Sequence, residues 1–166
     1  MSPETGLPAL GWAEVVDAVP ELAGAVQSRF ETHPHHVIAT LHQDGRPRVS
    51  GTNVMFDDGY MWMGSMPDSR RGADLLRDPR CALHSAPLDE ELAEGSGDAR
   101  VEALALRLPD DVAIELLREA WGDDATIDGD MMELRIRSMS LVTVEGDEMR
   151  VRSWSPGQGV RDVRRK

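Results

Sequence analysis

Hydrophobic and polar residues alternate over many short stretches of this chain, a period that predicts β-strands with one buried face. Within residues 35–64, three such stretches are separated by Gln-Asp-Gly and Asp-Asp-Gly, which are turn sequences typical of antiparallel hairpins. Seven strands are predicted in all, at 37–41, 48–56, 60–63, 81–85, 99–108, 131–146 and 149–154.

Apolar residues spaced three or four apart replace this alternation elsewhere and predict helices. They lie at 11–31, where Pro20 begins a second helical piece, at 69–78 and at 109–122. The strands follow one another instead of alternating with helices. We therefore expect a mostly β (α+β) fold, an antiparallel barrel with three or four flanking helices, and not a doubly wound parallel sheet. The residues expected to face the core from the last helix are Val112, Leu116 and Trp121.

The composition indicates one globular domain over residues 1–166, with an acidic run at 89–91 that we expect to be solvated. A net charge of −12 argues against nucleic acid as a partner, because such binding depends on neutralising phosphates. No apolar run approaches the roughly 20 residues of a membrane helix, and no secretory signal is visible, so no membrane partner is expected. The single cysteine, Cys81, fits a cytoplasmic location.

Two cations occupy an unfavourable place in the helix that begins after Ser69. Arg70 and Arg71 lie in its first turn, where the helix dipole already carries partial positive charge. A bound anion would reverse that cost, because free backbone N–H groups and guanidinium groups would both face it. The alternative is that Asp68 and Asp74 pair with the two arginines on the surface.

The neighbouring strands are short of large side chains near this helix start. Gly51 interrupts the strand 48–56, and a glycine within a strand often marks the close approach of a ligand. The next strand runs into Gly64 and Ser65 just before the arginines. Together these residues would form a shelf for a flat ring beside a socket for its phosphate.

The succession PRVSGTNVMFDDGYMWMGS and then MPDSRRGADLLRDPRCALHS resembles the pyridoxamine 5'-phosphate oxidase-like, FMN-binding split β-barrel proteins. More closely, it is similar to their flavin/deazaflavin oxidoreductase branch, over about residues 30–155. The resemblance implies a split β-barrel and a homodimer with the cofactor at the subunit interface. It further implies an oxidoreductase that uses FMN, or alternatively a deazaflavin coenzyme, on an unidentified small-molecule substrate.

The same resemblance implies which positions would contact the cofactor. They are Arg48, Val49, Ser50, Gly51, Met63, Gly64, Ser65, Ser69, Arg70 and Arg71. Hydride transfer belongs to the cofactor, so no catalytic residue is assigned. The Arg-x-His pattern of true pyridoxamine phosphate oxidases is absent from the tail, and that reaction is not expected. Two alternatives stay open: a non-catalytic flavin- or tetrapyrrole-binding protein of the same fold, and a β-barrel interaction module without cofactor.

Other candidate chemistry is weaker. The histidines in 33–36 surround a proline and lack neighbouring ligands, so no metal site is expected. Cys81 and His84 should point to opposite faces of one strand, which argues against a catalytic pair. Trp154 precedes Pro-Gly near the end of the chain, where it would either wall the ligand groove or pack in the core.

Overall fold

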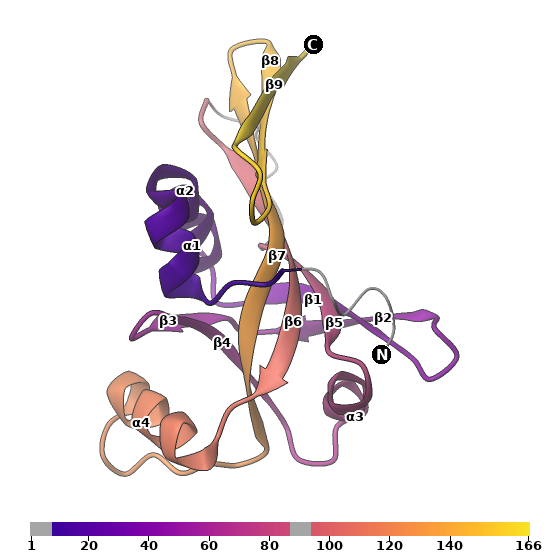
Figure 1. Cartoon of the computed structure of the whole chain (residues 1–166), viewed down its shortest axis with the longest axis vertical. Coiled ribbons are helices and arrows are strands. Elements are labelled where there is room, and N and C mark those ends of the chain that lie inside the picture. Colours follow the sequence, from indigo (N-terminus) through magenta and orange to yellow (C-terminus); the bar gives the residue numbers. More distant parts are fainter. Residues whose placement is uncertain (1–7, 87–93) are drawn as a thin grey trace.

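The computed structural model describes residues 8–86 and 94–166 (Figure 1), so the acidic run at 89–91 lies outside the described residues. The helices are α1 (Trp12–Ala18), α2 (Pro20–Glu31), α3 (Arg70–Arg77) and α4 (Asp110–Trp121). The strands are β1 (His36–Leu41), β2 (Pro47–Thr52), β3 (Met55–Asp57), β4 (Tyr60–Ser65), β5 (Arg80–His84), β6 (Gly97–Arg107), β7 (Asp130–Glu145), β8 (Glu148–Trp154) and β9 (Arg161–Arg165).

The described strands form one antiparallel sheet, which confirms the predicted mostly β fold. The order is β2-β1-β5-β6-β7-β4-β3, while β8 pairs with β7 and β9 pairs with β8. With the end of β7, these last two strands form an arm that points away from α3 and α4 (Figure 1). The ladder between β6 and β7 runs from Gly97↔Thr143 to Arg107↔Met132 and joins the two ends of the sheet.

Most of the core lies between the first two helices and the sheet. Leu22, Val26 and Phe30 repeat every four residues along α2, as the sequence predicts, and all three are buried. A second apolar cluster under α4 contains Trp62 and Leu116. No helix in the described part of the chain is both long and apolar enough to cross a membrane.

Two strands differ from the predicted ones. The stretch 48–56 forms both β2 and β3, because β1 begins at His36 and offers no ladder partner beyond Thr52. The tail forms β9, which the hydrophobic pattern did not predict. Its ladder with β8 pairs Arg152 with Asp162, and Asp162 forms an ion pair of 2.5 Å with the diagonal neighbour Arg150. Charge pairing across the hairpin replaces apolar alternation there.

Trp121 was predicted to face the core, and this is wrong. Its side chain is 63% exposed and meets Trp62 edge-on, with ring centroids 5.9 Å apart. The buried stripe of α4 consists of Ala113, Leu116 and Leu117. Trp121 is the last residue of the helix and lies beyond the part of α4 that this stripe covers.

A buried carboxylate fixes α3 to the edge of the sheet. Asp74 accepts hydrogen bonds from Arg48 Nε at 2.6 Å, from Arg77 Nη2 at 2.9 Å and from Thr40 Oγ1 at 3.3 Å. Burial raises the pKa of the Asp74 carboxyl, but the hydrogen bonds and charges of the two arginines outweigh it and leave that pKa below its ordinary value. Asp74 therefore sets the position of α3 relative to β1 and β2.

We predict that Asp74→Asn lowers the free energy of unfolding by about 2–3 kcal/mol at pH 7, because two guanidinium groups lose their counter-charge. The pKa of Asp74 is lower in the folded chain. Its stabilisation is thus present above the unfolded value of roughly 3.9 and is lost as the pH falls through the folded value. Urea unfolding of the wild type and of Asp74→Asn at pH 7 and pH 3 measures the difference in free energy of unfolding. A difference as large at pH 3 as at pH 7 would contradict the assignment.

Candidate functional site

The barrel is open between β2 and β4. Among the described strands, β2 forms a ladder only with β1, and residues 63–65 of β4 form one only with β7. The hydroxyl of Thr52 crosses this gap and donates to the sulfur of Met63 at 3.6 Å. The two strand edges thus lie near each other without backbone pairing.

The side chain of Arg71 bridges the same gap. Its Nη1 donates to the carbonyl of Gly51 at 2.5 Å, and its Nη2 donates to the carbonyl of Gly64 at 3.0 Å. Its Nε is buried and has no hydrogen-bond partner among the described residues. Burial lowers the pKa of this guanidinium, because the loss of water disfavours its charged form.

Arg71 forms no ion pair with any residue that the structure describes. The alternative reading of the sequence paired the two arginines with Asp68 and Asp74. Instead, Asp74 pairs with Arg48 and Arg77. Arg70 is exposed and, within 8–86 and 94–166, likewise forms no ion pair. The start of α3 therefore carries two positive charges without a carboxylate partner in the described residues.

The turn that presents these arginines is held by two serines. Ser69 caps α3, since its Oγ accepts from the backbone N–H of Gly72 at 3.0 Å. The hydroxyls of Ser65 and Ser69 share a hydrogen bond of 2.8 Å. A Cβ on Gly72 would come within 2.8 Å of the Ser65 hydroxyl, so this position requires glycine. The hydrogen bonds of the two serines and the close packing at Gly72 therefore fix the conformation of this turn.

Beside Arg71 lies an open shelf formed by Val49, Gly51 and Gly64. Val49 is 69% exposed. A Cβ on Gly51 would approach only the His36 carbonyl, at 4.0 Å, and one on Gly64 only the Met131 sulfur, at 3.7 Å. Internal packing does not require these two glycines. They leave room above the strands, as close approach by a ligand would need.

The predicted cofactor residues differ in their burial and in their hydrogen-bond partners. Ser50 carries a buried hydroxyl with no hydrogen-bond partner among the described residues. Arg48 is engaged within the chain, because it binds Asp74 and donates from Nη2 to His42 Nδ1 at 3.0 Å. The side chain of Met63 lies wholly within the main core.

Cys81, His84 and Trp154, three of the weaker candidates, are engaged in contacts within the chain. No group of three possible metal ligands occurs in the described residues. Cys81 is buried, its thiol donates to the Ala103 carbonyl at 3.6 Å, and burial raises its pKa to about 12. His84 Nδ1 donates to the Ser85 carbonyl at 2.7 Å instead of facing the thiol. Trp154 is buried and lines a hollow of about 440 Å³.

The chain belongs to a family described as pyridoxamine 5'-phosphate oxidase, whose sequence profile matches residues 22–150. This confirms the resemblance found in the sequence and, with the structural neighbours below, the split-barrel fold. A search of curated proteins found no match to the chain.

Three solved structures illustrate the fold. One is PhzG from Burkholderia lata 383 in complex with tetrahydrophenazine-1-carboxylic acid, with TM-score 0.64, 14% identity and coverage of 100% of this chain and 97% of that one. A heme binding protein from Mycobacterium smegmatis has TM-score 0.58 and 21% identity, and the match covers 79% of this chain but only 57% of that one. A putative pyridoxamine 5'-phosphate oxidase from Listeria innocua has TM-score 0.54 and 14% identity, over 72% and 97% of the two chains.

We predict that Arg71→Ala lowers the free energy of unfolding by roughly 1–3 kcal/mol, because two carbonyls at the barrel gap lose a charged donor. Arg70→Ala should change it by less than about 0.5 kcal/mol, since that side chain is exposed. Chemical denaturation of the two variants without added ligand gives both values. Equal effects of the two substitutions would show that Arg71 does not bridge the gap.

Proposed function

We propose that this protein binds FMN through its phosphate at Arg71 and acts as a flavin-dependent oxidoreductase on a small molecule. The observation that carries the proposal is the half-buried guanidinium of Arg71, which forms no ion pair with a described residue. A buried cation without a counter-ion is costly, and a phosphate beside it removes that cost.

The donors around Arg71 suit a phosphate group. Its unpartnered Nε and its remaining Nη hydrogens point to a ligand outside the protein's own bonding. Arg70 adds a second charge, and the first N–H groups of α3 add backbone donors. The orphaned hydroxyl of Ser50 supplies a further hydrogen bond nearby on β2. We propose these groups as the phosphate site.

The open shelf fits the flat part of the same cofactor. The ring would lie over Gly51 and against the exposed side chain of Val49. Val37 sits opposite Gly51 in the ladder between β1 and β2 and is itself 39% exposed. We propose that a second copy of the chain covers this apolar strip, so that the ring is enclosed at a homodimer interface.

When bound, FMN supplies the hydride and one-electron chemistry of the reaction. The residues of this chain would hold the phosphate, keep the ring in one orientation and exclude water from the groove. No side chain near the shelf is assigned a proton-transfer role. The proposal therefore names a reaction class, an oxidation or reduction, and leaves the substrate to the chemistry of the surrounding groove.

A deazaflavin coenzyme also carries a phosphate, so Arg71 alone suits both cofactors. FMN is preferred because its phosphate is a terminal monoester with up to two negative charges, which suits the two arginines and the backbone N–H groups at the start of α3. A tetrapyrrole has no phosphate and offers only its carboxylates to an arginine. Titrations with FMN, with a deazaflavin coenzyme and with haem can therefore separate these three ligands.

We predict that Arg71→Gln weakens FMN binding about 100-fold, because both the charge and the fork of donors are lost. Arg70→Gln should weaken it about 10-fold. Arg46→Gln is the matched control, since Arg46 is exposed and bound to Asp44 on a distant turn. Quenching of flavin fluorescence measures all three. Unchanged FMN affinity in Arg71→Gln, or tight haem binding with none of FMN, would overturn the proposal.

The dimer gives a separate prediction. Val49→Asp should shift the protein from dimer to monomer, because a charge would be buried in the apolar strip. Val16→Asp, at an exposed valine of α1, should leave the dimer intact. Light scattering during gel filtration measures the mass. A wild-type monomer at all concentrations tested would rule out a site shared between two copies.

A further inference from the structure

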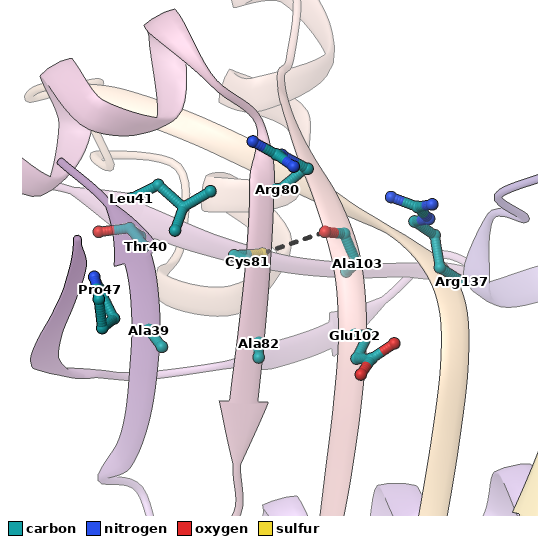
Figure 2. Close-up of a pocket in the computed structure, with 10 residues that line it drawn as sticks. All are labelled: Ala39, Thr40, Leu41, Pro47, Arg80, Cys81, Ala82, Glu102, Ala103 and Arg137. Carbon is teal, nitrogen blue, oxygen red and sulfur yellow. Dashed lines mark hydrogen bonds between the residues drawn. The ribbon is translucent and has the colours of Figure 1, made fainter. Parts of the chain in front are cut away.

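A groove of about 340 Å³ runs across β1, β5 and β6, outside the phosphate site described above. Its volume is within the range of about 300–1,000 Å³ typical of small-molecule pockets. Figure 2 shows the side chains that line it. Apolar or small residues form most of its wall, and its charged residues are Arg80, Glu102 and Arg137.

Arg137 enters this groove because of a β-bulge. The ladder between β6 and β7 pairs Glu102 with Ser138 but Ala103 with Ile136, so Arg137 is the extra residue at the shift. A bulge of this kind redirects a side chain and often occurs next to a functional site. Arg137 is half-buried. It forms no hydrogen bond or ion pair with a residue in the described ranges.

The other charged groups of the groove are engaged within the chain. The Nη2 of Arg80 lies 2.7 Å from the Asp78 carboxylate. Glu102 accepts a hydrogen bond of 2.9 Å from the hydroxyl of Ser138. In Figure 2, Arg137 and Glu102 lie at the same side of the groove, and Leu41 and Pro47 lie at the other. Arg137 is thus the charged group of the groove that has no partner in the described part of the chain.

We propose that this groove binds a small apolar molecule that carries one carboxylate, with the carboxylate on Arg137. The fork of the guanidinium matches a carboxylate, and the alanine-rich wall accepts a flat hydrocarbon body. Glu102 lies on the same side and would repel a second anionic group, which restricts the class to a single anionic group.

The groove adjoins the proposed flavin shelf. Ala39, in the groove wall, is the ladder partner of Val49, which belongs to the shelf. We therefore assign the ligand of this groove as the substrate or product of the flavin reaction, an assignment that rests on the proposed function. A carboxylate on Arg137 would anchor it while its apolar body extends along β1 toward the ring.

The test uses the full chain with FMN added and two probes of equal shape, 2-naphthoate and the uncharged 2-naphthalenemethanol, followed by calorimetry. The wild type should bind the carboxylate about 10-fold or more tightly than the alcohol. Arg137→Gln should abolish that preference and leave alcohol binding unchanged. Arg118→Gln, on the exposed side of α4, is the matched control and should behave as the wild type. Ala82→Trp should fill the groove and prevent binding of both probes.

Several results would overturn the proposal. One is an unchanged preference for naphthoate in Arg137→Gln. Another is no probe binding by the wild type together with a monomeric Ala82→Trp variant, which would make the groove a contact between subunits. FMN affinity is measured in every variant. Because Arg137 lies outside the phosphate site, unchanged FMN affinity in Arg71→Gln would reject the cofactor and not the groove.

Discussion

The arrangement of this protein depends on one half-buried guanidinium that closes an opening in the sheet. Arg71 donates to carbonyls of two strands, β2 and β4, that have no ladder between them. It does so without a carboxylate partner in the described residues, so the barrel holds a positive charge at its gap. Gly51 and Gly64, whose carbonyls it binds, add no side chains beside it. Structural closure and the proposed recognition of phosphate therefore rest on the same side chain.

The position of this guanidinium is fixed by neighbouring residues in and just before α3 that do not pair with it. Asp74 is the nearest acidic residue in sequence on α3, yet its two oxygens bind Arg48 and Arg77. Ser69 caps the helix and Ser65 supports the cap. These interactions orient α3 and leave Arg71 without a carboxylate partner among the described residues. The bulge at Arg137 places a second such charge in a groove one strand away from the shelf.

Much of the fold could be predicted from local patterns. Alternation and turn sequences located β1, β4 to β8 and the hairpins, and the unfavourable pair of cations in the first turn of α3 drew attention to Arg70 and Arg71. Partners distant in sequence could not be predicted. Nothing near Arg48 indicates that it binds Asp74, and nothing near Arg137 indicates a bulge, because both depend on the register between strands. The strand β9 was missed since charge pairs, not apolar residues, hold it to β8.

The central claim is that the Arg71 guanidinium binds the phosphate of FMN while it spans the gap. Its Nε–H can be observed directly by ¹⁵N–¹H NMR, with the resonance assigned by its absence from an Arg71→Lys sample. Addition of FMN should move that resonance and slow its exchange with water, and riboflavin, which lacks the phosphate, should do neither. An Nε–H signal that stays unchanged at saturating FMN would contradict the account.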